Sequence, residues 1–304
     1  MVSSRQVSVV IPCYNQGRFL GQAIESALRQ EGCGRVEVVV VDDGSADATA
    51  EVAARYTGVK YIRQANAGLA AARNRGLAES GGEYVVFLDA DDRLSPEALR
   101  VGVDALDSRP DLAFAFGFVT LIDADGAPIL CPPSLKIQQD PYVELLRHNH
   151  IWSCGAVIYR RDIFGRVGRF NTAVSASADY DLNIRIASRF PILCHGQVVL
   201  EYRKHNDNMT RDFALMLKSA VTVRRSHARY VRRSSVHRIA LETGIKAVQR
   251  DYGEKLVRSV RSQIQSREWA RALPNILTLL QYYPTGLASL ARRKLLYPTG
   301  GKDL

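Results

Sequence analysis

The chain contains, at residues 82–92, the sequence Gly82-Glu83-Tyr84-Val85-Val86-Phe87-Leu88-Asp89-Ala90-Asp91-Asp92. Its apolar part, Tyr84 to Leu88, is too short for a helix and rich in β-branched and aromatic residues, which predicts a strand buried on both faces. Carboxylates follow directly. In an open α/β sheet the ligand crevice lies outside the carboxyl ends of the strands, so Asp89, Asp91 and Asp92 are expected at a binding site.

These clustered carboxylates allow two interpretations. Hard oxygen ligands suit Mg²⁺ or Mn²⁺ when the ion keeps several waters and shares phosphate oxygens. Alternatively, the carboxylates form a polar turn before a helix, because Ser95 and Pro96 suit the N-cap and N1 positions. The Asp-x-Asp pattern alone does not decide between a metal site and a turn.

The sequence before this strand alternates between strand and helix patterns. Short apolar runs at 7–12 and 36–41 predict two buried strands, and residues 60–63 predict a third, short one. Helical patterns separate these strands, one of them at 46–56, and an alanine-rich helical pattern at 66–76 leads into the strand at 84–88. This alternation predicts a parallel sheet with right-handed crossovers.

A second strand end also carries carboxylates, Asp42 and Asp43, and the helix between the two acidic strand ends bears Arg73 and Arg75. Such a pocket suits a nucleotide with a diphosphate. The chain has neither Gly-x-Gly-x-x-Gly after its first strand nor a Gly-x-x-x-x-Gly-Lys-Ser/Thr loop. A divalent ion, Mn²⁺ or Mg²⁺, is therefore the expected means of neutralising the phosphates.

Four segments occur in a characteristic order: Val-Ser-Val-Val-Ile-Pro-Cys-Tyr-Asn (7–15), Val-Val-Val-Asp-Asp-Gly-Ser-Ala-Asp-Ala-Thr (39–49), Asn-Ala-Gly-Leu-Ala-Ala-Ala-Arg-Asn-Arg-Gly (66–76) and Phe-Leu-Asp-Ala-Asp-Asp (87–92). Together they resemble the family 2 glycosyltransferases, inverting enzymes of the GT-A fold. The resemblance is dense over residues 7–100. It implies an α/β fold with a Rossmann-like, mostly parallel sheet flanked by helices.

The resemblance also implies a nucleotide-sugar site at the strand ends. Asp43 would accept a hydrogen bond from the base, and Arg73 would lie near the diphosphate unless it is a surface arginine. Asp91 would be the direct metal ligand, and Asp89 would contact ribose or a metal-bound water. His205 would coordinate the metal or contact the diphosphate, with a structural loop histidine as the alternative. The donor contacts expected are Pro12, Tyr14, Asn15, Asp42, Asp43, Gly68, Arg73, Asp89 and Ala90.

The catalytic base implied by the resemblance is Asp179. The family usually has Glu-Asp at this position, whereas here Ala178 precedes the aspartate. Asp181 is expected to be a helix-start charge favoured by the dipole. Trp152 and Tyr180 are expected near the acceptor, with a core position as the alternative for Trp152.

The net charge of +10 is distributed unevenly. Residues 1–211 contain 23 Lys and Arg against 25 Asp and Glu, whereas residues 212–304 contain 18 against 6. We therefore expect a GT-A domain at 1–211, with its nucleotide-sugar half at about 1–100 and its acceptor half at about 101–211. Residues 212–304 are expected to form a basic helical C-terminal region.

The composition favours an ordinary globular protein of the cytoplasm. Five cysteines with no Cys-x-x-Cys spacing argue against a disulfide framework or a zinc site, and no run reaches the ~20 apolar residues that span a bilayer. A peripheral position on the inner membrane face is also considered, because Ser219–Arg233 and Leu287–Leu296 combine basic and apolar residues, as interfacial helices do. The alternative is a solvated helical face.

The predicted activity is inverting transfer of a sugar from a nucleotide-diphosphate sugar, UDP-sugar favoured, to a glycan or lipid-linked acceptor hydroxyl. The expected setting is bacterial polysaccharide, glycolipid or other glycoconjugate synthesis. A sugar nucleotidyltransferase is the rival enzyme, but it would need a glycine-rich basic loop at residues 13–19. A binding protein for anionic polymers is the rival from another class; no nucleic-acid reading element is evident.

Overall fold

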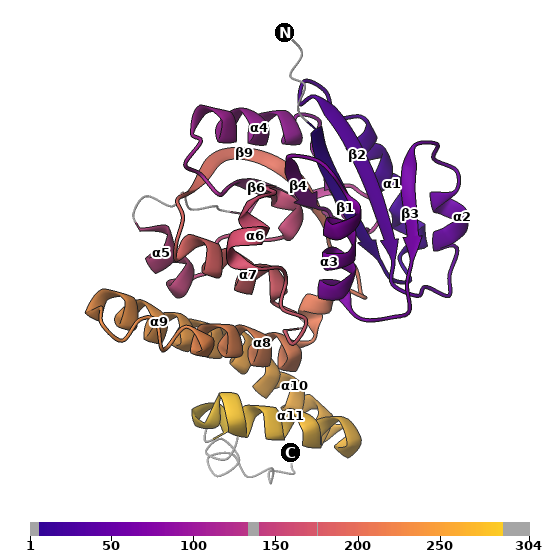
Figure 1. The fold of residues 1–304 in the computed structure, drawn as a ribbon. Helices are drawn as coiled ribbons and strands as arrows, with labels where there is room; N and C mark the ends of the chain where they lie inside the picture. Colours follow the sequence, from indigo (N-terminus) through magenta and orange to yellow (C-terminus); the bar gives the residue numbers. More distant parts are fainter. Residues whose placement is uncertain (1–5, 133–139, 175, 288–304) are drawn as a thin grey trace, which may run out of the picture. The chain divides into compact units, whose positions relative to one another are not determined.

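A computed structural model describes residues 6–132, 140–174 and 176–287 (Figure 1). The chain divides into two compact units. One is formed by Met1–Leu145 and Asn149–Asn208, the other by Leu146–His148 and Met209–Leu304. The strands of the described residues all lie in the first unit, and the second unit is helical.

The first unit is built on one mixed sheet. Among the described residues its strands follow the order β3-β2-β1-β4-β8-β6-β9-β5, with β7 paired to β6. β1, β2, β3 and β4 pair in parallel, as do β6 and β9, whereas β8 and β5 run antiparallel to their neighbours. This arrangement confirms the predicted mostly parallel α/β sheet. The strands are β1 (Gln6–Cys13), β2 (Arg35–Asp42), β3 (Val59–Arg63), β4 (Tyr84–Phe87), β5 (Arg93–Leu94), β6 (Phe114–Ile122), β7 (Pro128–Leu130), β8 (Val157–Arg160) and β9 (Ile192–Arg203).

Helices cover both faces of the sheet. Alternate residues of β2 point to opposite sides, so that Val38 and Val40 join the core beneath α1 and α4, whereas Val39 and Val41 pack with Ala72 of α3. The helical elements of this unit are α1 (Gly17–Leu28), α2 (Thr49–Ala53), α3 (Leu69–Glu79), α4 (Ala98–Ser108), α5 (Pro141–Arg147, which continues into the second unit), η1 (Cys154–Ala156), α6 (Ile163–Val167) and α7 (Ala178–Ala187).

Helix α3 approaches the sheet closely because it has no side chain at Gly76. A Cβ atom there would lie 2.2 Å from Val10 Cγ1, which is far below any real contact distance. Ala72 on the same helix is fully buried. The small residues of α3 therefore bring its preceding loop, residues 64–68, up to the carboxyl ends of β1 and β2.

Helix α2 is shorter than the predicted helical run at 46–56. Ala46 and Asp47 are held in the loop instead, because Ala46 N–H donates to Asn15 Oδ1 (2.9 Å) and Asp47 Oδ2 accepts from Gly17 N–H (2.8 Å). Asp47 Oδ1 also accepts from the Thr49 hydroxyl (2.5 Å). The residues lost from the helix thus tie the loop after β2 to the loop after β1.

The second unit contains α8 (Phe213–Ser226), α9 (Ser235–Val248), the π-helical turn η3 (Gln249–Gly253), α10 (Glu254–Gln265) and α11 (Trp269–Tyr282). The helical C-terminal region expected from the sequence is confirmed. Its core includes Leu217 and Val221 of α8, Val260 of α10 and Leu279 of α11.

One expectation for this unit needs correction. Ser219–Arg233 is not one amphipathic helix, because α8 ends at Ser226 and turns its apolar residues into the core of the unit. Of Leu287–Leu296, only Leu287 lies within the described residues. None of the described helices combines the length and the apolar character needed to cross a bilayer.

The five cysteines are free thiols, but only Cys13, Cys33 and Cys154 are buried. Burial raises the pKa of Cys13 to about 11, so this thiol stays protonated near neutral pH. Cys131 is exposed and Cys194 is half-buried.

Candidate functional site

The carboxyl ends of β1, β2 and β4 meet at one edge of the sheet. Cys13 at the end of β1 lies beside Asp42 at the end of β2. On the other side of β1, Leu88 N–H donates to the Val10 carbonyl (2.9 Å), which aligns the residues after β4 with the same edge. The predicted convergence of the acidic strand ends is therefore present.

The loop after β1 is fixed by Asn15. This residue has a left-handed backbone (φ 53°), and its N–H donates to Ser45 Oγ (2.9 Å) while its side-chain oxygen accepts from Ala46 N–H. Tyr14, next to it, is exposed, whereas Pro12 is buried within β1. The geometry leaves Tyr14 free to present its ring to a ligand at this edge.

The two carboxylates after β2 bind the protein's own loops. Asp42 accepts from Ser45 N–H (2.7 Å) and from the Tyr61 hydroxyl (2.6 Å). Asp43 accepts from Gln64 Nε2 (2.7 Å), Ala67 N–H (2.9 Å) and Gly68 N–H (2.8 Å).

Both carboxylates are buried. Gly68 has a backbone conformation (φ 89°) that favours glycine. The contact of Asp43 with a base therefore stays a prediction, and the role visible in the structure is to shape the loop at 64–68.

Arg73 is not a surface arginine. It is 3% exposed, and its Nη2 donates to Asp89 Oδ1 at 2.6 Å. Its guanidinium lies over the ring of Phe170 (5.5 Å), and its Nε has no hydrogen-bond partner among the described residues. Burial raises the pKa of Asp89, while the positive charge of Arg73 opposes this and Asp91 and Asp179 reinforce it. Arg73, Asp89, Asp91 and Asp179 thus form one electrostatic cluster.

Asp91 is oriented by His205. Their side chains meet at 2.8 Å between His205 Nε2 and Asp91 Oδ2. His205 Nδ1 accepts from Asp207 N–H (3.2 Å), which favours the tautomer that carries its proton on Nε2, facing Asp91. The predicted position of His205 beside Asp91 is present, and its role as a metal ligand stays a prediction.

Asp92 has a structural role. Its side chain is buried, accepts from Arg203 N–H (2.9 Å) and contacts the Ser153 hydroxyl (3.4 Å). Burial and the charges of Asp91 and Asp89 raise its pKa well above the usual range. Asp92 therefore joins the end of β4 to β9 and to the loop at 152–153.

Asp179 lies in the first turn of α7. One carboxylate oxygen accepts from the adjacent Tyr180 N–H (2.8 Å), and the other makes no hydrogen bond within the described residues. The negative charge of Asp179 contributes to raising the pKa of Asp89 and the pKa of Arg73. Asp181, by contrast, is buried and paired with Arg185 (2.9 Å), which supports the helix.

The two acceptor-side aromatic residues differ in position. Tyr180 is 2% exposed and its hydroxyl donates to the Leu145 carbonyl, contrary to the prediction that it contacts an acceptor. It is buried because α7 is covered on nearly all of its surface, with only Asp179 and Arg185 partly exposed. Trp152 is 44% exposed, so it is not a core tryptophan, and the ammonium of Lys204 lies 5.8 Å from its ring centroid.

Arg203 is a site residue that the sequence patterns did not single out. It is fully buried, and its guanidinium donates to the Asp91 carbonyl (2.8 Å), the Ala124 carbonyl (2.9 Å) and Gln22 Oε1 (2.7 Å). The sequence feature that could have indicated this role is a charged residue at the end of an apolar strand. Arg203 fixes the backbone that carries Asp91.

The donor atoms fit a divalent ion that is shared with a ligand. No group of three His, Cys, Asp or Glu side chains in the described ranges is arranged to hold a metal by itself. Asp91 Oδ1 and Asp89 Oδ2, however, have no hydrogen-bond donor among the described residues. One or two carboxylates with phosphate oxygens and waters are the usual ligands of Mg²⁺, and these two oxygens suit that set.

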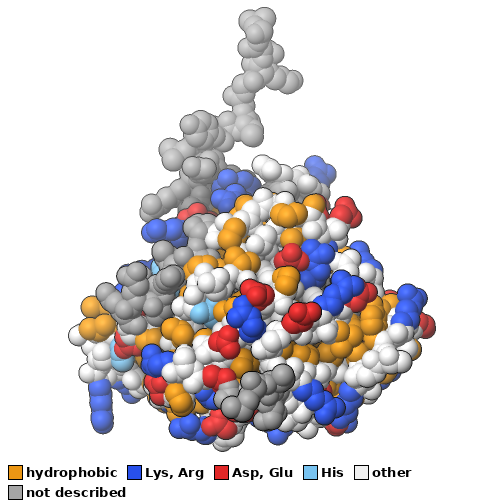
Figure 2. Space-filling model, turned by 90° about the horizontal axis from the view of Figure 1, so that it is seen from above, with side chains coloured by type: hydrophobic (Ala, Val, Ile, Leu, Met, Phe, Trp, Pro, Cys, Tyr) orange, Lys and Arg blue, Asp and Glu red, His pale blue; other side chains and the backbone are white. Residues whose placement is uncertain are grey.

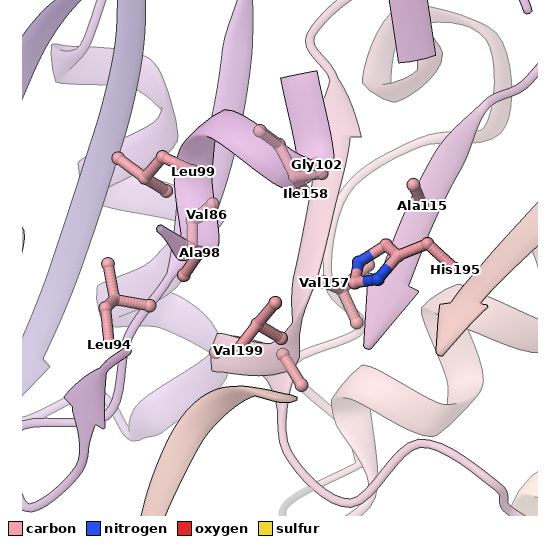
Figure 3. Close-up of a pocket in the computed structure, with 12 residues that line it drawn as sticks. Val86, Leu94, Ala98, Leu99, Gly102, Ala115, Val157, Ile158, His195 and Val199 are labelled. Carbon is pink, nitrogen blue, oxygen red and sulfur yellow. The ribbon is translucent and has the colours of Figure 1, made fainter. Parts of the chain in front are cut away.

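A separate small cavity lies away from these carboxylates, between α4 and the sheet (Figure 3). It measures about 10 Å³, room for about one water, and its lining is apolar except for His195. Burial lowers the pKa of His195 to about 4. The cavity offers no set of polar groups for a ligand.

Comparison with known proteins identifies relatives of the first unit. The family model described as "Glycosyl transferase family 2" matches residues 8–168. The "Uncharacterized glycosyltransferase EpsJ" of Bacillus subtilis (strain 168) is 30% identical over 221 residues, covering 67% of this chain and 62% of that protein. An "Uncharacterized glycosyltransferase" of Rickettsia felis is 32% identical over 213 residues, covering 66% of this chain and 34% of that protein. The chain thus spans less than two thirds of the length of these relatives.

A solved structure supports the fold. The crystal structure of S. aureus TarS 1-349 in complex with UDP-GlcNAc superimposes with a TM-score of 0.57 at 18% identity, covering 92% of each chain. The form of TarS 1-349 in complex with UDP gives a TM-score of 0.54 at 20% identity, again over 92% of each chain. At this identity the likeness concerns the fold.

Proposed function

The chain belongs to glycosyl transferase family 2, and on this premise we propose that it transfers a sugar from a nucleotide-diphosphate sugar to an acceptor hydroxyl with inversion. The observation that carries the proposal is the cluster of Asp89, Asp91, Asp179 and Arg73 at the edge where β1, β2 and β4 end. The buried Arg73 meets three partly exposed carboxylates there, beside the loop that presents Tyr14.

A UDP-sugar is the favoured donor. The ring of Tyr14 and the loop shaped by Asp43 and Gly68 offer a surface for the base and ribose. TarS, whose fold resembles this chain, has been crystallised with UDP and with UDP-GlcNAc, which supports a uridine nucleotide.

Asp91 and Asp89 would hold a divalent metal ion, Mn²⁺ or Mg²⁺. When bound, such an ion neutralises charge on the leaving diphosphate. His205 keeps the Asp91 carboxylate in one orientation, and Arg203 fixes its backbone. Arg73 holds Asp89 and adds a positive charge to the cluster.

Asp179 would act as the general base. The acceptor oxygen forms the new bond to the anomeric carbon while the bond from that carbon to the phosphate oxygen breaks, and the nucleoside diphosphate leaves with that electron pair. The acceptor proton passes to the carboxylate oxygen of Asp179 that has no hydrogen bond within the described residues.

The acceptor is proposed to be a glycan or a lipid-linked glycan of polysaccharide, glycolipid or other glycoconjugate synthesis, met at a membrane surface. Exposed Trp152 offers a flat ring for a sugar, and Ser153 connects the same loop to Asp92. Lys204 beside Trp152 adds a positive charge.

A donor panel tests the proposal without knowledge of the acceptor. Thermal unfolding is measured with UDP-, GDP- and dTDP-sugars, each with Mn²⁺ and with EDTA, because a ligand that binds the folded state raises the midpoint. A rise with UDP-sugars and Mn²⁺ is expected. No rise with any nucleotide sugar would contradict the proposed function.

A further inference from the structure

The second unit exposes a strongly basic segment between α8 and α9. Residues 213–241 contain seven Lys and Arg and no Asp or Glu. We call residues 228–239 the basic elbow; its arginines are Arg229, Arg232, Arg233 and Arg238. All four are exposed, and none forms an ion pair with a carboxylate among the described residues. Elsewhere in this unit basic side chains do find partners, as Lys255 does with Asp251.

Large apolar side chains are exposed among these arginines. Tyr230, Val236 and Ile239 are 57%, 54% and 56% exposed. Val236 and Ile239 lie about one turn apart on α9, so they share a face of that helix. The elbow therefore presents positive charge and apolar surface together, whereas basic, acidic and apolar side chains are interspersed on the face of the molecule shown in Figure 2.

The fold of the second unit holds these side chains outward. Val231 is buried in the middle of the elbow, and Ala240 and Leu241 are buried directly after it. Ser234 caps α9 by accepting from His237 N–H (3.2 Å). With these residues anchored, the intervening side chains cannot turn into the core of the unit.

We propose that the basic elbow docks the protein on the surface of an anionic lipid bilayer. The four arginines would contact lipid phosphates, and Tyr230, Val236 and Ile239 would enter the interface, as amphipathic membrane-binding segments do. This inference rests on the proposed function in one respect. The proposed function supplies the purpose of docking, which is to hold the enzyme beside a lipid-linked acceptor.

Charge complementarity favours a lipid surface over other occupants. A second copy of the elbow would oppose four arginines with four arginines, and the second unit, Leu146–His148 with Met209–Leu304, has few acidic residues to offer. A single-stranded nucleic acid would be expected to use several aromatic stacking platforms, whereas the elbow carries one aromatic ring, Tyr230, alongside aliphatic side chains.

The test is co-sedimentation of the full chain with two kinds of vesicle, phosphatidylcholine alone and phosphatidylcholine mixed with phosphatidylglycerol. We expect binding to the acidic vesicles only, weakening as salt is added. Arg232→Glu/Arg233→Glu should lower the partition coefficient by about 25-fold or more, since each basic residue contributes about fivefold. Arg250→Glu/Arg258→Glu is the matched control, because it makes the same change in charge on exposed arginines outside the elbow.

Separate outcomes decide the proposal. Retained binding in the control and reduced binding in Val236→Asn/Ile239→Asn, which keeps the charge, would support docking through the elbow. Equal loss in the elbow and control variants, equal binding to neutral vesicles, or no binding by the wild type would overturn it. So would a preference for an oligonucleotide over acidic vesicles at physiological salt.

The donor panel run on the same preparations separates the two proposals. UDP-sugar stabilisation without vesicle binding refutes the elbow alone, and elbow-dependent vesicle binding without any nucleotide-sugar effect supports the elbow while refuting the proposed function.

Discussion

Arg73 Nη2 lies 2.6 Å from Asp89 Oδ1, and this ion pair joins α3 to the end of β4. Both partners are needed, because an unpaired charge at a buried position loses its hydration without compensation. The pair also sets the charge of the site, since the Arg73 guanidinium opposes the rise in the pKa of Asp89 that burial causes.

Arg73→Met should destabilise the fold by about 3 kcal/mol, because the variant removes a buried guanidinium and leaves the half-buried Asp89 carboxylate without its partner. The urea midpoint of the purified variant measures this loss. Arg18→Met removes the exposed pair with Asp207 and should leave the midpoint nearly unchanged. A midpoint for Arg73→Met equal to that of the wild type would contradict the account of this pair.

Asp91→Ala should abolish transfer and weaken UDP binding while the fold persists, because removing one of several clustered carboxylates relieves repulsion in the metal-free protein. Isothermal titration with UDP, with and without Mn²⁺, tests this expectation. EDTA should have the same effect on the wild type, and full activity in EDTA would remove the metal from the mechanism.

His205→Ala should reduce kcat/KM by about 10–100-fold, the usual effect of losing a group that orients a metal ligand. His205→Gln can still place an N–H donor near Asp91 and should recover part of the loss. If the histidine only supported the loop at 204–208, both variants would show lower thermal stability with unchanged kinetics for the folded fraction.

His195 predicts a pH dependence of stability that is independent of the catalytic cluster. Its pKa falls from 6.5 to about 4 on folding, so between these values the unfolded chain binds the proton more strongly. The contribution of His195 is full above pH 6.5 and is lost as the pH falls toward 4. Comparing urea midpoints at pH 7 and pH 5 should show a smaller difference for His195→Leu than for the wild type.

The sequence predicted what depends on local pattern. The apolar run at 84–88 predicted β4, and the carboxylates after it, Asp89 and Asp91, lie at the predicted sheet edge. Strand alternation likewise predicted the parallel pairing of β1, β2, β3 and β4.

Contacts between distant segments could not be read from the same patterns. Arg203 binds the Asp91 carbonyl across a sequence separation of 112 residues, and no periodicity links the two. The burial of Tyr180 depends on which side of α7 meets Leu145. The unbroken basic and apolar pattern at 219–233 concealed the end of α8 at Ser226, which is what creates the basic elbow.

Asp179→Asn in a single-turnover assay tests the central claim most directly. The amide keeps the size of the side chain but cannot take the acceptor proton, so the donor dissociation constant should stay near that of the wild type while transfer slows by roughly 10²–10⁴-fold. Asp181→Asn, two residues from the proposed base and paired with Arg185, serves as the control for helix stability. If Asp179→Asn transfers the sugar within a few-fold of the wild-type rate, Asp179 is not the base, and the mechanism proposed for this site is wrong.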